Sequence, residues 1–176
     1  MNKKQTLPLI CILGMPVILI ITSFMTRANI NFFGEPLFLS VFLYPLTNLI
    51  SGLIVKKAGY KKGLLMMSLS LVSSALAFIV QWALLNTVDY FAMIYIFMSV
   101  LINQLIFIYT YDFLLKINKN TYLWVFLLVV VVSAIDNAFF GAIIEGKYVS
   151  LSILVRIIYA VVIPVVLAKK SNADSK

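Results

Sequence analysis

Two apolar stretches near the end of the chain decide the fold: Tyr122 to Ile144, YLWVFLLVVVVSAIDNAFFGAII, and Tyr148 to Ala168, YVSLSILVRIIYAVVIPVVLA. As helices, both are long enough to cross the hydrocarbon core of a bilayer, which is about 30 Å thick. The short polar turn Glu145-Gly146-Lys147 joins them, so the sequence predicts an antiparallel helical hairpin. The first stretch contains an acid, Asp136, and the second contains a base, Arg156.

The positions of these two charges in the hairpin match. Asp136 precedes Gly146 by ten residues and Arg156 follows it by ten. At helical rise both lie roughly 15 Å from the turn, so we expect them to form an ion pair. A charge at this depth costs at least about 2.5 kcal/mol, and pairing offsets much of that cost. The pair is either a structural salt bridge or part of a polar site inside the bundle.

The composition is that of an integral membrane protein. Of 176 residues, 63% are hydrophobic and 11% are charged, whereas soluble domains have about 25% charged residues. There is no histidine, which excludes a histidine metal site or general base, and the single cysteine excludes an intrachain disulfide. We expect one membrane domain, residues 1–168, and a polar cytoplasmic tail, residues 169–176.

The apolar segments predict an all-α membrane protein with six transmembrane helices in a compact bundle. The predicted spans are Leu7–Thr26, Leu37–Val55, Leu64–Leu85, Tyr90–Leu114 and the two arms of the hairpin.

The basic residues predict the orientation of these spans. If the N-terminus is cytoplasmic, the opposite side carries only Arg27 and Lys147. The cytoplasmic side then carries Lys3, Lys4, Lys56, Lys57, Lys61, Lys62, Lys116, Lys119, Lys169, Lys170 and Lys176. This asymmetry predicts that both termini lie in the cytoplasm. Asp136 and Arg156 would then lie in the outer half of the bilayer.

The second predicted span is rich in residues that interrupt or pack helices. Pro45, Thr47, Asn48, Ser51 and Gly52 lie close together. A proline leaves a carbonyl one turn back without its usual donor, and broken spans with spare polar groups often line transporter sites. Alternatively, Ser51 and Gly52 form a small-residue face that lets another helix approach closely. Both interpretations stay open.

No enzyme motif occurs in the sequence, and we predict no enzymatic activity, no cofactor, no metal site and no binding of nucleic acid. The residues that could bind a solute are a set of polar groups within the apolar segments, with aromatic rings nearby. Polar groups beside aromatic faces suit a small planar polar solute. The candidate substrate-binding residues are Asn48, Asn103, Gln104, Asp136, Asn137, Phe139, Phe140 and Arg156.

Several short motifs resemble the queuosine-precursor transporters, the YhhQ or VUT family. They are Ile20-Ile21-Thr22-Ser23, Tyr44-Pro45-Leu46-Thr47, Gly59-Tyr60-Lys61-Lys62 and the stretch Ser133–Phe140, in the order and spacing of that family. Pro164 matches a proline in the family's last span. Arg156 stands where the family usually has a lysine, and Gly52 stands where it usually has an aspartate.

The resemblance implies a six-span inner-membrane carrier of a 7-deazaguanine such as preQ0 or preQ1, with Asp136 reading the ring edge. The family's bundle is distantly similar to the substrate-binding S components of energy-coupling-factor vitamin importers, so one alternative function is that of an S component. The other alternative is a non-transporting bundle, such as a cell-envelope assembly or immunity protein. The expected partners are the solute and the lipid bilayer; an ATPase module and a second copy of the chain are further candidates.

Overall fold

The structure, a computed structural model, describes residues 3–24, 29–32, 35–38, 40–43, 45–85, 90–143 and 149–168. In chain order its elements are α1 (Lys3–Phe24), β1 (Asn29–Phe32), β2 (Glu35–Phe38), α2 (Ser40–Leu43), α3 (Leu46–Ala58), α4 (Tyr60–Leu85), α5 (Tyr90–Lys116), α6 (Tyr122–Ile143) and α7 (Val149–Leu167).

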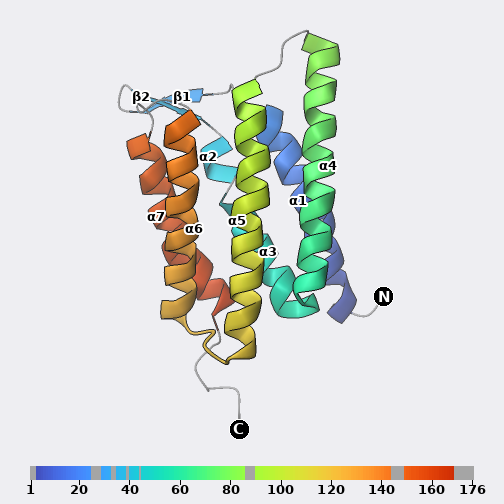
Figure 1. The fold of residues 1–176 in the computed structure, drawn as a ribbon, viewed down its shortest axis with the longest axis vertical. Helices are drawn as coiled ribbons and strands as arrows, with labels where there is room; N and C mark the ends of the chain where they lie inside the picture. The colour runs from blue at the N-terminus through green and yellow to red at the C-terminus, as the bar shows by residue number, and fades with distance from the viewer. Residues whose placement is uncertain are drawn as a thin grey trace.

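The helices form a bundle with α3 in its middle, where it contacts α1, α4, α5 and α7 (Figure 1). Around it, α1, α4, α5, α6 and α7 each contact the next in that order. The helices alternate in direction. Helices α1, α4 and α6 begin at one end of the bundle, and α3, α5 and α7 end there. We call this end the lysine end. Strands β1 and β2 pair antiparallel at the opposite end. The predicted helical bundle is confirmed in this coarse form.

The predicted second span, Leu37–Val55, is broken at Pro45, as its composition suggested, but its predicted start at Leu37 is wrong. Leu37 belongs to strand β2, and α2 is a single turn that stops before Pro45. Helix α3 begins only at Leu46. Proline has no N–H to donate, and its ring clashes with the carbonyl one turn back, so a regular helix rarely continues through it. The segment is therefore divided, and α3 is left with 13 residues.

A single residue, Gly59, separates α3 from α4. Its φ of 81° lies in the left-handed region, which glycine adopts at little cost. Because this turn is so short, α4 begins at Tyr60 and not at Leu64 as predicted. The lysines whose side chains the structure describes all lie at this end of the bundle: Lys56, Lys57, Lys61, Lys62, Lys116 and Lys119.

The last turn of α7 is held by donors from other parts of the lysine end. The Leu167 carbonyl accepts hydrogen bonds from Lys56 Nζ at 2.8 Å, the Tyr111 hydroxyl at 2.9 Å and Asn120 Nδ2 at 3.2 Å. Burial lowers the pKa of Lys56 from its ordinary value of 10.5. The carbonyls at a helix end have no partner within the helix, so these side chains fix α7 against α3 and α5.

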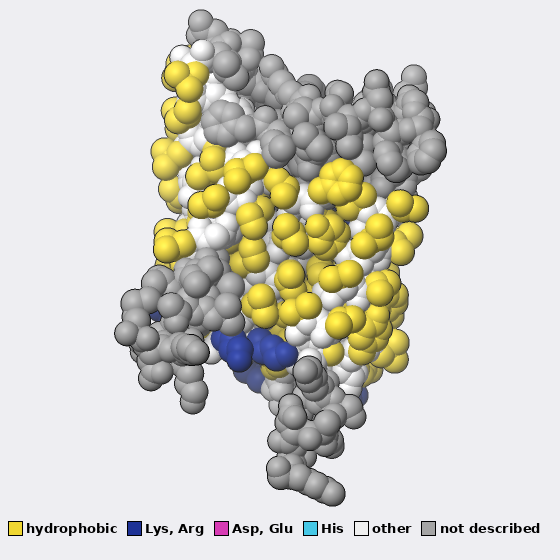
Figure 2. All heavy atoms as spheres, turned by 180° about the vertical axis from the view of Figure 1, so that it is seen from behind, with side chains coloured by type: hydrophobic (Ala, Val, Ile, Leu, Met, Phe, Trp, Pro, Cys, Tyr) yellow, Lys and Arg dark blue, Asp and Glu magenta, His cyan; other side chains and the backbone are white. Residues whose placement is uncertain are grey.

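The outer surface of the bundle is largely apolar. Leu84, Val165 and Leu123 are 74%, 67% and 61% exposed. Figure 2 shows such side chains spread over one face, and the Lys and Arg side chains that the structure describes on this face lie toward its lower end. Among the described residues, Tyr60–Leu84 is the one helix long and apolar enough to cross a membrane. Shorter apolar helices cover Ile12–Thr22, Tyr122–Asp136 and Leu154–Leu167.

Candidate functional site

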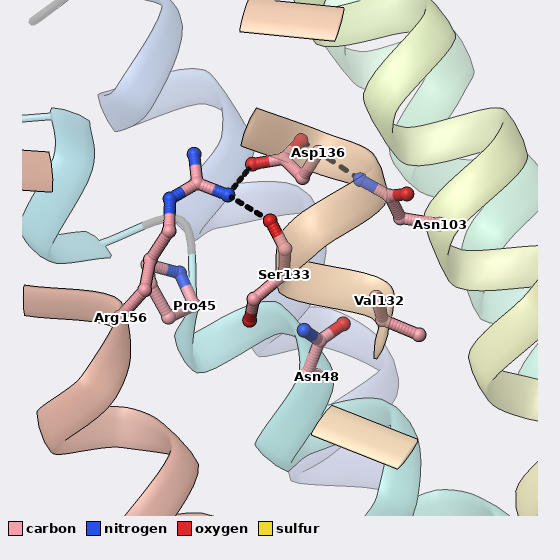
Figure 3. Close-up of a pocket in the computed structure, with 7 residues that line it drawn as sticks. All are labelled: Pro45, Asn48, Asn103, Val132, Ser133, Asp136 and Arg156. Atoms are coloured by element: carbon pink, nitrogen blue, oxygen red, sulfur yellow. Dashed lines mark hydrogen bonds and ion pairs between the residues drawn. The ribbon is translucent and has the colours of Figure 1, made fainter. Parts of the chain in front are cut away.

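Asp136 on α6 and Arg156 on α7 form an ion pair in the interior, which confirms the pairing predicted from the hairpin (Figure 3). Arg156 Nη1 contacts Asp136 Oδ2 and also donates to the Ser133 carbonyl at 3.4 Å. The side chains are only 2% exposed for Asp136 and 8% for Arg156. Helices α6 and α7 are antiparallel neighbours joined by a short connection. Asp136 and Arg156 are the same number of residues from it, so the two charges lie at the same depth.

Helix α5 supplies two consecutive amides that reach different neighbours. Asn103 Nδ2 donates to Asp136 Oδ1 at 2.7 Å, which leaves both carboxylate oxygens of Asp136 with a partner. Gln104 Nε2 donates to Thr47 Oγ1 at 2.8 Å and to Asn48 Oδ1 at 2.9 Å. Successive helical residues point about 100° apart, so one amide faces α6 and the other faces α3.

The Gln104 amide also accepts a hydrogen bond from the Ser51 hydroxyl. Thr47, Asn48, Ser51 and Gln104 are all buried, and a buried polar group without a partner is costly. The Gln104 amide bonds to all three α3 side chains, and this network joins the first two turns of α3 to α5.

A small cavity lies between these groups. It is lined by Pro45, Asn48, Asn103, Val132, Ser133, Asp136 and Arg156. Its free space is about that of a single water molecule. Four parts of the chain therefore meet at this cavity: the break at Pro45 with the first turn of α3, the middle of α5, the second half of α6 and the first half of α7.

The structure brings together four of the predicted site residues, namely Asn48, Asn103, Asp136 and Arg156. A fifth, Gln104, does not line the cavity but holds Asn48, which does. The predicted roles of Asn137, Phe139 and Phe140 lie outside the described part of the structure, because only their backbone in α6 is described.

Sequence reasoning missed Ser133 and Pro45 as lining residues of the cavity. The sequence carried a signal for Ser133, since it precedes Asp136 by three residues and residues at that spacing share a helix face. Pro45 was recognised as a break in the second span but not as part of the site, because its distance from α6 and α7 depends on how the helices pack.

Different residues of the second span line the cavity and pack against a neighbouring helix. Asn48 lines the cavity beside the break at Pro45. Gly52, one turn further on, packs against α7: a Cβ placed there would lie 2.2 Å from Leu167 Cδ1. The glycine therefore allows the close approach of α3 and α7, and an aspartate at this position would collide with Leu167.

Comparison with protein-family models, curated proteins and solved structures finds no match to the chain. The functional assignment therefore rests on the residues of the site and their arrangement.

Proposed function

We propose that this chain is a bacterial inner-membrane protein that crosses the bilayer six times, with both termini in the cytoplasm. Support comes from the large apolar side chains exposed along the helices, because soluble proteins rarely expose contiguous apolar patches of more than a few hundred Å². The described lysines gather at one end, as the positive-inside rule requires of a cytoplasmic side.

We propose further that the bundle carries a small planar polar solute and that Asp136 binds it. The observation that carries this proposal is a buried carboxylate, held by Asn103 and Arg156, facing a polar cavity at the break before α3. Ionisable groups at this depth are costly and are usually functional. A carboxylate accepts two parallel hydrogen bonds, which fits an N–H and an amino group on one ring edge.

The resemblance of the motifs suggests a 7-deazaguanine precursor of queuosine, preQ0 or preQ1, as the solute. In that assignment Asp136 accepts from the ring N–H and the exocyclic amino group, and Asn48 reads the adjacent carbonyl. Gln104 acts on the solute only indirectly, since its amide holds Asn48 and Thr47. Arg156 keeps the carboxylate ionised.

One observation favours a second candidate, a bundle that transports nothing and uses the pair as a structural lock. Both oxygens of Asp136 already have protein partners, and the cavity has room for about one water molecule. A carrier must therefore open this site before it binds a solute, whereas a lock never opens.

A complementation experiment tests whether the chain carries the proposed solute. In a bacterial host that cannot make queuosine precursors or import them, expression of the chain should restore queuosine in tRNA when low preQ0 or preQ1 is supplied. Asp136→Ala should abolish this rescue. Asp112→Asn is the matched control, because Asp112 pairs with Lys116 near the lysine end of α5; it should keep the rescue. Well-expressed protein that gives no rescue and binds no deazaguanine would eliminate the proposed solute.

A further inference from the structure

The charges around Asp136 constrain the kind of solute that the site accepts. Asn103 Nδ2 occupies Oδ1 of the carboxylate, and Arg156 Nη1 occupies Oδ2 (Figure 3). With the cavity as small as it is, a solute reaches the Oδ2 side of Asp136 only if the guanidinium of Arg156 moves away.

Charge balance then becomes the deciding factor. Among the side chains that the structure describes, Asp136 and Arg156 are the only buried charged ones. If Arg156 leaves and a neutral solute takes its place, the carboxylate is stranded in a low-dielectric interior, which is strongly unfavourable. A cationic solute would replace one positive charge by another.

We infer that Arg156 is an internal substitute for the solute, and that the site takes a planar monocation with N–H donors, such as an amidinium, a guanidinium or a ring bearing an ammonium group. This inference rests on the proposed carrier function and narrows its substrate class. Of the two deazaguanines only preQ1 carries a positive charge at neutral pH, on its aminomethyl group, and to replace Arg156 it would have to present that group to Asp136 in place of the ring edge.

The geometry of the pair supports the substitution. Arg156 Nη1 makes two contacts at once, one to Asp136 Oδ2 and one to the Ser133 carbonyl, which lies one turn earlier on α6. The Ser133 carbonyl and the Asp136 carboxylate are thus two acceptors that can both bind the N–H groups of one planar cation. A free guanidinium or amidinium presents the same donors.

The test is chemical rescue of a variant that lacks the substitute. Arg156→Ala removes the guanidinium and leaves a space beside Asp136. Purified protein in lipid nanodiscs is then heated with methylguanidinium or with methylurea, which is similar in shape and planar but neutral. At about ten times its Kd, methylguanidinium should raise the Tm of Arg156→Ala by about 3–6 °C. Methylurea should leave the Tm unchanged.

Two controls make the result specific to Asp136. The wild-type protein, whose own guanidinium fills the place, should not respond. The double variant Asp136→Asn/Arg156→Ala should not respond either, because the carboxylate is gone. Equal stabilisation by the cation and the neutral compound would overturn the inference, and so would an equal response of the double variant.

If Arg156→Ala does not fold alone, the same compounds are added during cell-free synthesis into nanodiscs, and recovery of folded protein becomes the readout. Arg156→Gln is the second variant, since it keeps a shorter hydrogen-bonding side chain without the charge. Failure of methylguanidinium to recover or stabilise either variant would overturn the inference. Rescue by methylguanidinium in a protein that binds no deazaguanine would keep the cationic site and reject only the proposed solute.

Discussion

At the residue scale, the ion pair between Asp136 and Arg156 dominates the interior. Each charge would be costly to bury alone. Each residue also has a second partner: Asp136 accepts a hydrogen bond from Asn103, and Arg156 donates one to the Ser133 carbonyl. Such pairs contribute little net stability relative to a well-packed apolar core, but losing one partner strands the other. The pair is thus sensitive to single substitutions.

A double-mutant cycle measures this sensitivity. Asp136→Asn and Arg156→Leu should each lower the free energy of unfolding by about 3–5 kcal/mol, because each leaves an uncompensated buried charge. The double variant should lose clearly less than the sum of the two single losses. Denaturant unfolding of the purified protein in mixed micelles, followed by circular dichroism, gives the four free energies.

The control for this cycle is Asp112→Asn. Asp112 Oδ2 pairs with Lys116 Nζ at 2.6 Å, but the lysine side chain is 66% exposed, and exposed pairs contribute little. This change should affect unfolding far less than Asp136→Asn. Additive losses at Asp136 and Arg156 would show that the two side chains do not interact.

At the scale of elements, the central feature is α3, a short helix packed on four sides by longer ones. Pro45 and Gly59 bound it at its two ends. Its polar residues meet α5 through Gln104, and its glycine meets α7. Because α7 is also fixed by hydrogen bonds to the Leu167 carbonyl, the α3–α7 contact positions the helix that carries Arg156.

Gly52→Ala tests the α3–α7 contact. The added methyl would meet the buried Leu167 side chain at 2.2 Å, and overpacking of this kind costs about 1–3 kcal/mol. We expect that loss in the free energy of unfolding, measured as for the ion pair. Adding Leu167→Ala to this variant should cost less than Leu167→Ala costs in the wild type, because the clash is relieved.

Gly14→Ala is the matched control on α1. No heavy atom lies within 4 Å of a Cβ built at Gly14, and alanine is the better helix former by about 0.5–1 kcal/mol. This variant should be as stable as the wild type or more stable. A loss equal to that of Gly52→Ala would attribute the effect to the glycine backbone and not to Leu167.

At the scale of the whole molecule, the lysine end and the exposed apolar side chains of the helices are the basis of the proposed orientation in a membrane. Reporter fusions after Lys62, Lys119 and Lys170 should all give a cytoplasmic signal, and a fusion at Asn86 should give an outside signal. Alkaline phosphatase and green fluorescent protein, active on opposite sides of the inner membrane, provide the two readouts. An outside signal after Lys62 would reverse the orientation of α4 and contradict the proposed topology.

The hairpin of α6 and α7 and the pairing of Asp136 with Arg156 could be predicted from the sequence alone. Both follow from local quantities: the length of each apolar stretch, the short turn and equal residue counts on either side of it. The chain order of the lysines likewise predicts that they share one end, since each long helix reverses the direction of the previous one.

How α3 and α5 contribute to the site depends on the packing of the helices and could not be predicted from the sequence. The sequence marks Asn48, Asn103 and Gln104 as polar, but which of them reaches Asp136 depends on the rotation of α5 between α3 and α6. The fit of Gly52 against Leu167 was equally inaccessible, whereas the division of the second span was indicated by Pro45. Contacts between helices that no short turn connects depend on how side chains interlock across the whole bundle, and no local pattern in the chain specifies that packing.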